Sequence, residues 1–588
     1  MKVSLQKALS LYLTGSTNPC SLSFCDTKNC PYTEDELAEM GTSLKEREDS
    51  NENSYKFKNP TLALNADYDS FTGYMRNAGL GVFDSLSTGI GSGFASKIDF
   101  KSGVALASLS VLGSIASRFK NLPVLTTNFS LFDVGARLIR APLHFFDSTF
   151  SQVGEKGADF TLPSAIAGIG SLFSLSRVLK DKDDKSLEVP NTTISGTVGR
   201  TALHHLESML ASKGTQISTN HESTSAFLAG SALTSGLLLP DSIKNKDLPY
   251  QTFEGLIAQG GTHFLDSLFA NIGNSFSKVL LNFGNSQNAL IGSLGLLLGL
   301  PLLGTIPKIQ NHEASFSKLG GRLIRSLLHA PETLVFNLGN SLGKSILGIP
   351  LSLGFLGLTY LGCISKSCKN ILKNFKIPMN TIGGQLQRLP FDFIYSLISA
   401  SGIKLSQFIP SPILVLIGPA LSFQIGERFK NIDAKYNELK GLMVRNTAHL
   451  WETILSNAAY RTGRLLTRTQ DDRSSSGSVL SDGRWLTSEG QIVPTMAIGK
   501  QMNHGEEKNI KSMLLSGLGG IAFGFGAFMF SKHLMKGKVN EEKQIESQVH
   551  KVIGNVSVEN DTERLIIKPT IYENPVGVYR GKPAKQAA

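Results

Sequence analysis

The chain alternates between two kinds of segment from about residue 71 onwards. The first kind has apolar positions at helical spacing and carries a few charged side chains on one face. A polar or glycine-containing joint follows, and then a strongly apolar run. These runs cover residues 102–117, 163–176, 225–240, 289–306, 346–364, 409–425 and 512–530. The pattern predicts an all-α fold in which each repeat is a helical hairpin with one amphipathic and one apolar arm.

A stripe of three side chains marks the amphipathic arm. In GGRLIRSLLHAPETLVF, read as a helix, Arg325, His329 and Glu332 stand at i, i+4 and i+7 and therefore share one face. Other copies of the stripe are Arg140, His144 and Asp147; Arg200, His204 and Glu207; Gln259, His263 and Asp266; and Arg445, His449 and Glu452. Two weaker copies have Asn77, Gly81 and Asp84, and Arg388, Asp392 and Tyr395.

The spacing of these copies predicts a repeat architecture. The acid slots fall at 84, 147, 207, 266, 332, 395 and 452, in steps of 63, 60, 59, 66, 63 and 57 residues. A near-constant period means that each unit buries its apolar face on its neighbours. We therefore expect seven repeats of about 60 residues in one membrane-associated array, rather than several independent domains.

Length, composition and charge favour a membrane for the apolar runs. The last four runs approach the roughly 20 residues that a bilayer-spanning helix needs, and all contain small residues that let helices approach closely. Charged residues make up only 18% of the chain. We expect at least the runs 289–306, 346–364 and 512–530 to span.

Positive charge follows every apolar run, as in 118–120, 177–185 and 531–538. This bias predicts that these ends and the tail lie on the cytoplasmic, anionic side of the bilayer. A soluble α-solenoid is the alternative, because cations also favour helix C-termini. The net charge of +11 is not arranged as a nucleic-acid-binding face, so lipid is the predicted partner.

The remaining segments complete the predicted organisation. Residues 1–70 are a polar leader, 71–435 contain repeats one to six, and 436–470 form the striped helix of repeat seven. A Ser-rich linker and β-hairpin insert (471–508), which could bind a protein partner, precedes the last apolar helix (509–535). A charged tail (536–588), a second candidate partner site, ends the chain. Cys20, Cys25 and Cys30 in the leader have no assignable role, because their spacing is wider than that of usual zinc sites.

Three roles for the stripe remain open. The preferred one is a polar ladder in which Arg, His and acid satisfy one another and bridge successive repeats, because charges in a low-dielectric setting must be paired. The members of this ladder are Arg140, His144, Asp147, Arg200, His204, Glu207, Gln259, His263, Asp266, Arg325, His329, Glu332, Arg388, Asp392, Arg445, His449 and Glu452. The stripes could also line a polar cavity or pore.

Metal binding is the least favoured role, because each helix supplies only two ligand types. Its candidates are the His–acid pairs His144 and Asp147, His204 and Glu207, His263 and Asp266, His329 and Glu332, and His449 and Glu452. The sequence contains no catalytic or cofactor-binding motif that stands in its required context.

These observations predict a non-enzymatic, multi-pass membrane protein that acts as a scaffold or as a pore or transport body. The alternatives are a soluble or peripheral α-solenoid that binds protein or lipid, and, third, a membrane enzyme with His–carboxylate metal sites.

Overall fold

The computed structural model divides the chain into a compact unit, Met1–Met529, and a second unit, Phe530–Ala588, which lies outside the described residues. In the first unit, the described ranges are 54–67, 69–130, 132–180, 187–220, 222–249, 251–282, 295, 297–315, 317–364, 376–378, 380–430, 432–435, 437–467, 478–479, 485–486 and 492–493. The fold of this part is all-α, as predicted, with only two-residue strands. The predicted leader to residue 53, the apolar run 512–530 and the tail lie outside the described residues.

The striped segments form long helices, here called the inner helices. They are α3 (Phe71–Ala95), α7 (Leu143–Ala158), α9 (Ile194–Asn220), α12 (Phe253–Asn282), α15 (Leu319–Lys344), α18 (Ile382–Gln407) and α20 (Leu439–Leu466). The second stripe is divided, because α6 (Val134–Arg140) ends just before Pro142 and α7 begins just after it.

Apolar runs form a second set, the outer helices. They are α4 (Phe100–Phe119), α8 (Thr161–Leu179), α10 (Glu222–Leu238), α16 (Gly348–Ile364) and α19 (Ser411–Arg428). Short helices α5 (Pro123–Thr126), α11 (Asp241–Lys244) and α14 (Pro307–Gln310) lie in the joints that follow outer segments. The run 289–306 is described only in part.

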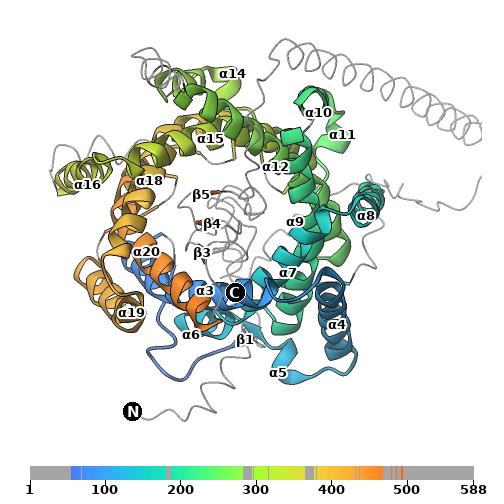
Figure 1. Cartoon of the computed structure of the whole chain (residues 1–588), viewed down its shortest axis with the longest axis horizontal. Coiled ribbons are helices and arrows are strands. Elements are labelled where there is room, and N and C mark those ends of the chain that lie inside the picture. The colour runs from blue at the N-terminus through green and yellow to red at the C-terminus, as the bar shows by residue number, and fades with distance from the viewer. Residues whose placement is uncertain are drawn as a thin grey trace, which may run out of the picture. The chain divides into compact units, whose positions relative to one another are not determined.

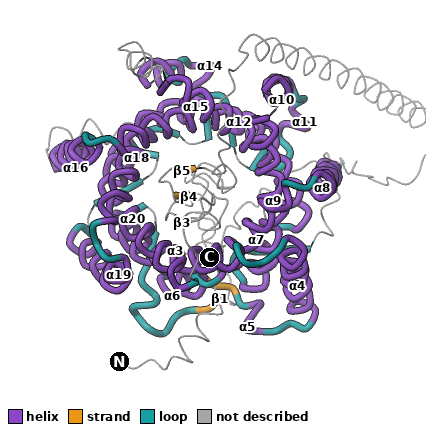
Figure 2. The backbone as a smooth tube through the Cα atoms, in the orientation of Figure 1, coloured by secondary structure: helices purple, strands orange, loops and turns teal. Residues whose placement is uncertain are grey.

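The inner helices contact one another in a closed cycle, which we call the ring. Going round it, α3 packs on α7, α7 on α9, α9 on α12, α12 on α15, α15 on α18, α18 on α20, and α20 on α3 again. Figures 1 and 2 show the inner helices as this ring with the outer helices around it. Chain order and neighbour order therefore agree at every step except the last, which joins the two ends of the series.

Each outer helix packs beyond the repeat in which it is found. Helix α4 contacts α7 and α9, α8 contacts α9 and α12, and α16 contacts α18 and α20. By the same offset α19 lies on α20 and α3, so it covers the step at which the ring closes. Each of these described outer helices thus joins its own repeat to the two that follow around the ring.

A short extended segment precedes each inner helix, and consecutive segments pair through their backbones. The pairs are Asn65 with Asp133, Glu188 with Thr252, Asp247 with Lys318, Glu313 with Thr381, Lys376 with Glu438 and, across the closing step, Ser70 with Asp433. The parallel pair β1 (Ser54–Tyr55) and β2 (Asn128–Phe129) lies beside them, and Phe129 N–H donates to the Thr192 carbonyl in the second junction. All inner helices therefore begin at one face of the ring, the bridge face. Residues 54–67, assigned above to a leader, belong to this layer.

Glycine is needed at the start of the inner helix in six of the seven repeats. Thr381 caps α18 by accepting a hydrogen bond from Gly384 N–H at 3.1 Å, and a Cβ on Gly384 would overlap the carbonyl oxygen of Pro378. The same close approach occurs at Gly73, Gly196, Gly255, Gly321 and Gly441. The second repeat has Ala136 instead, at the start of its divided helix.

The predicted hairpin insert contains β3 (Ser478–Val479), β4 (Trp485–Leu486) and β5 (Ile492–Val493), which pair antiparallel in that order. The backbone of β3 approaches α3 and α20, and that of β5 approaches α15.

Candidate functional site

The stripe side chains are buried between neighbouring inner helices. Each member of the predicted ladder is 6% exposed or less, and Arg140, Arg325 and Arg388 are among the largest fully buried side chains. Burying an ionised group costs free energy unless it is paired and hydrogen-bonded. The contacts of these groups therefore indicate what the stripe does.

Arginines of the stripe bind the backbone of the extended segments. Arg200, Arg325, Arg388 and Arg445 each donate to the carbonyl oxygen eleven residues earlier, at distances between 2.6 and 3.4 Å. The acceptors are Val189, Ala314, Ile377 and Ala434, and the N–H of each of these residues donates to the extended segment of the next repeat around the ring, which for Ala434 is that of the first repeat. One arginine thus fixes one link of the bridge face.

In the three other copies of the stripe, the residue at the arginine position differs in its identity or in its hydrogen-bond acceptor. Asn77 replaces the arginine in the first repeat and still donates to the Ala66 carbonyl, eleven residues earlier. Arg140 donates forward to the Asn191 carbonyl at 3.3 Å. Gln259 is buried, but its amide nitrogen has no partner among the described residues.

Within each full stripe the histidine faces the acid of its own helix. Nδ1 lies 2.8 Å from the carboxylate in His204–Glu207, 3.0 Å in His329–Glu332 and 2.9 Å in His449–Glu452. The aspartate copies are longer, at 3.2 Å for His144–Asp147 and 3.4 Å for His263–Asp266. Since Asp is one methylene shorter than Glu, it reaches the ring nitrogen less closely.

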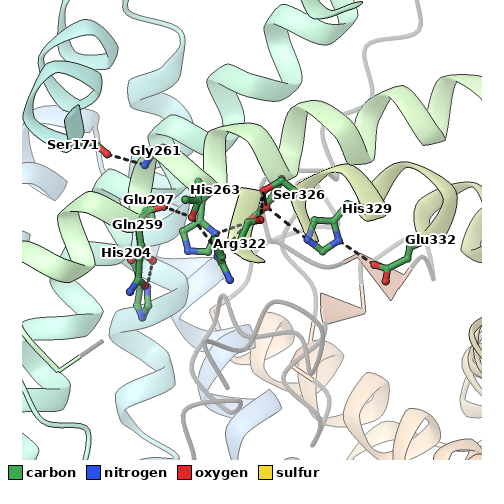
Figure 3. Close-up of polar contacts among 12 residues, drawn as sticks. Ser171, His204, Glu207, Gln259, Gly261, His263, Arg322, Ser326, His329 and Glu332 are labelled. Atoms are coloured by element: carbon green, nitrogen blue, oxygen red, sulfur yellow. Dashed lines mark hydrogen bonds and ion pairs between the residues drawn. The ribbon is translucent and has the colours of Figure 1, made fainter. Parts of the chain in front are cut away.

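The other ring nitrogen faces the acid of the preceding repeat. Nε2 of His144 lies 3.6 Å from Asp84, that of His204 lies 3.5 Å from Asp147, and that of His329 lies 3.7 Å from Asp266. Glu207 also interacts electrostatically with His263 of the next helix. Figure 3 shows this series across α9, α12 and α15. Acid and histidine thus alternate from one repeat to the next.

The weaker copies use other groups at the same level. Tyr395, which stands in an acid slot, stacks on the ring of His449, and Ser399 Oγ hydrogen-bonds His449 Nε2. At the closing step Tyr74 of α3 donates its hydroxyl to Glu452 at 2.9 Å. The sequence showed Tyr395 only as an exception and gave no role to Tyr74.

Two further buried arginines were not predicted from the sequence. Arg137 lies 2.7 Å from Asp84, and Arg322 lies 3.2 Å from Asp266, each reaching back to the preceding repeat. Ser326 also hydrogen-bonds Asp266. The signal was present as the motif RLIR in both stretches, with a second arginine three residues before the stripe arginine.

Small residues let neighbouring inner helices cross closely on the C-terminal side of the stripe. A Cβ on Gly91, Gly154, Gly214, Gly273 or Gly339 would overlap a backbone carbonyl of the next inner helix. Each of these glycines follows its acid slot by seven residues. The closing step differs, because there Gly89 and Gly463 make the close approach between α3 and α20.

The described residues contain no group of three or more His, Cys, Asp or Glu side chains able to hold a metal ion. The candidate metal ligands of the stripe are the His–acid pairs described above. Outside the ladder, burial and the nearby Lys244 lower the pKa of His312, and hydrogen bonding by Ser102 lowers that of Asp99, the N-cap of α4.

Large apolar side chains are exposed on the outer helices. Leu109 and Leu112 of α4, Ile169 and Phe173 of α8, and Leu416 of α19 are each 60% exposed or more. Among the described residues, α4 and α8 are long and apolar enough to cross a membrane, and α15 with Gly348–Thr359, bent by 111°, is a third candidate. The chain can therefore associate with a membrane.

The described residues test the predicted choice of spans only in part. The sequence favoured 289–306, 346–364 and 512–530, and among the described helices length and hydropathy single out α4 and α8, while 289–306 is described only in part. The run 346–364 starts as a helix only at Gly348, after α15 has ended, and α16 is 17 residues long. The run 512–530 lies outside the described residues.

Comparisons with protein families, with characterised proteins and with solved structures find no match to this chain. The geometry of the ring and of its buried side chains is therefore the basis on which a function can be assigned.

Proposed function

We propose that this protein is a non-enzymatic, multi-pass membrane protein built from seven helical-hairpin repeats. In this proposal the array closes into a ring that serves as a scaffold or as a pore or transport body. The outer helices face lipid. The Arg–His–acid stripes form a polar ladder that joins each repeat to the next.

One observation carries the proposal: charge is buried and large apolar side chains are exposed. Ladder groups are 6% exposed or less, whereas Leu109 is 65%, Ile169 68% and Leu416 80% exposed. A surface helix of a soluble protein presents its polar face outward. The helices α4 and α8 present apolar side chains outward along most of their length, which suits lipid as the surrounding solvent.

Helix length supports the same proposal. The outer helices have between 17 and 20 residues, which at 1.5 Å per residue is about 26–30 Å. The hydrocarbon core of a bilayer is about 30 Å thick. Close crossings through Gly154, Gly214 and Gly273 also suit a membrane, where small residues replace the hydrophobic effect as the basis of helix association.

Burial of the ladder favours a structural role for it over the lining of a water-filled pore. His144, His204 and His329 each lie between the acid of their own helix and that of the preceding inner helix. A histidine in this position connects one repeat to the next. In this proposal the basic ends of the outer helices, such as Lys120, Lys180 and Lys430, lie at an anionic, cytoplasmic headgroup layer.

Carbonate extraction of membranes from cells that express the chain tests the proposal. We expect the protein to stay in the pellet, together with an integral membrane marker. The variant Ile169→Ala serves as the matched control and should also stay, because alanine keeps the helix apolar. Release of the unaltered protein into the carbonate wash would contradict the proposal and would favour the soluble α-solenoid.

A further inference from the structure

The two faces of the ring differ in their surface chemistry. We call the face at which inner helices end and outer helices begin the turn face; it lies opposite the bridge face. Four turns there expose a large apolar side chain: Phe160 is 53% exposed, Ile346 95%, Phe408 79% and Leu465 67%. Neighbouring Leu347, Ile409 and Leu466 are exposed as well.

Lysines on the turn face point back at the protein backbone. Lys156 of α7 donates to the carbonyl oxygens of Ala95 and Ile98, at 2.7 and 2.6 Å. Lys404 of α18 donates to those of Lys344 and Ser345. In each case the lysine caps the end of the preceding inner helix and its turn.

The same device recurs at two other junctions. Lys213 of α9 donates to the Ala158 carbonyl at 3.2 Å, and Lys97, next to α3, donates to the Thr467 carbonyl across the closing step. The last carbonyls of a helix have no partner within that helix, and at an aqueous surface water satisfies them. Hydrocarbon offers no such partner, so a carbonyl group left unsatisfied there destabilises the protein. Capping by lysine removes this need for water.

The bridge face has the opposite character. It exposes both signs of charge, as at Lys308, Glu313, Asp433 and Lys435. Its large apolar side chains stand beside exposed cations, as Phe119 does beside Lys120. Aromatic and basic side chains together are typical of a headgroup layer.

From this contrast we infer that the ring enters the bilayer by its turn face, so that Phe160, Ile346, Phe408 and Leu465 contact acyl chains at the far boundary of the hydrocarbon core while the bridge face stays at the cytoplasmic aqueous boundary. The inference rests on the proposed membrane location and adds an orientation to it. Continuity with the apolar outer surfaces of α8 and α19, which lead into the turns at Phe160 and Phe408, selects lipid as the occupant of this face.

The turn face is not apolar throughout, because Asp159 beside Phe160, Lys344 beside Ile346 and Asn220 at the end of α9 are exposed. The most polar of the described turns follows α3, where Lys97, Asp99 and Lys101 are exposed. It should sit in a headgroup or water-filled indentation of the turn face. This turn gives the test a second comparison point.

Tryptophan fluorescence of the full chain in phosphatidylcholine vesicles tests the orientation. The reporters are Phe408→Trp and Phe160→Trp on the turn face, Lys308→Trp on the bridge face and Ile169→Trp on the outer surface, each in a Trp451→Phe Trp485→Phe background. Lipids brominated on the acyl chains quench from the hydrocarbon side, and iodide quenches from water. If the background fails to fold, difference spectra against the parent with both tryptophans give the same comparison.

We expect both turn-face reporters to emit at shorter wavelength than Lys308→Trp and to lose most of their emission to brominated lipid. Iodide should quench mainly Lys308→Trp. A Lys101→Trp reporter in the polar turn should respond to iodide more than Phe408→Trp does.

Other outcomes separate the two hypotheses. If Ile169→Trp is quenched by lipid but both turn-face reporters are quenched by iodide, the orientation is wrong and the membrane proposal stands. If brominated lipid quenches none of the reporters, both the orientation and the membrane proposal are wrong. If the turn-face reporters are shielded from both quenchers and the protein has the mass of two chains, a second copy covers the turn face and the orientation is again wrong.

Discussion

The inner and outer helices bury opposite kinds of side chain, although they are built from similar lengths of chain. Inner helices bury arginine, histidine and carboxylate groups and present close-packed glycine to their neighbours. Outer helices bury mainly small residues, such as Gly103, Ala107 and Ser114 of α4, and expose leucine, isoleucine and phenylalanine. In a soluble protein the large apolar residues would be inside and most charges outside.

From this contrast we infer that the inner helices determine which repeats pack together, whereas the outer helices provide the affinity for lipid. Buried ion pairs give little net stability, but removing one partner leaves an uncompensated charge, so they tie each repeat to a defined neighbour. The exposed apolar side chains of the outer helices do not select a defined neighbour in this way.

Breaking one ladder pair should have the largest effect. Glu332→Ala leaves His329 without the carboxylate that lies 3.0 Å from its Nδ1, and we expect a loss of about 3–5 kcal/mol in the free energy of unfolding. His329→Ala should also destabilise. The double variant should lose less than the sum of the two, because it leaves no charge unpaired. Reversible unfolding in mixed detergent micelles measures all three, and strictly additive losses would contradict the pairing.

Much of this pair, and of the site, could be predicted from sequence. Arg325, His329 and Glu332 share one helical face by spacing alone, and their recurrence indicated contact between repeats. The acceptor of Arg325, the Ala314 carbonyl, could not be predicted because backbone groups leave no trace in residue type. Closure of the ring was also hidden, because it depends on the small rotation from each repeat to the next.

Other features were visible but not recognised. Glycine stands four residues before the stripe position in six repeats, as Gly384 does before Arg388, and its reason is the close approach of a carbonyl. Arg137 and Arg322 looked like ordinary helix surface, because pairing with an acid in the preceding repeat requires the offset between helices to be known.

A charge on an outer helix should have the next largest effect, and only if the helix faces lipid. Ile169 is ninth of the 19 residues of α8, near its middle. Lysine at the middle of a spanning helix costs about 2.5–3.5 kcal/mol, whereas an exposed substitution in a soluble protein changes stability by within about 0.5 kcal/mol. We therefore expect Ile169→Lys to reduce the membrane-inserted fraction strongly, with Ile169→Ala close to the parent. Unchanged insertion of Ile169→Lys would remove α8 from the lipid interface.

Glycines on the two kinds of helix should respond with opposite sign. Gly384→Ala forces a methyl group into the Pro378 carbonyl, and we expect a loss of about 1–3 kcal/mol or more. Gly354 of α16 has open space around its Cβ position. Gly354→Ala should therefore be neutral or stabilise by up to about 1 kcal/mol through helix propensity. Equal losses in the two variants, compared by midpoint of thermal unfolding, would contradict the packing difference.

The smallest expected effect concerns the start of an inner helix. Thr381→Ala removes the hydroxyl that accepts from Gly384 N–H, which should cost about 1 kcal/mol. Thr381→Ser keeps the acceptor and should retain most of the stability. The two variants differ mainly in this hydrogen bond, so equal losses, measured by the same thermal assay, would mean that the cap contributes little.

Spin labelling determines whether charge faces inward and apolar side chains face lipid. Single nitroxides at Ile169 and Leu109 would be read in a reconstituted bilayer against one at Lys308 on the bridge face, using collision with oxygen and with a soluble nickel complex. We predict that both outer-helix labels collide frequently with oxygen and rarely with nickel, and that the label at Lys308 does the reverse. Frequent collision with nickel at Ile169 and Leu109 would place the outer helices in water and contradict the account.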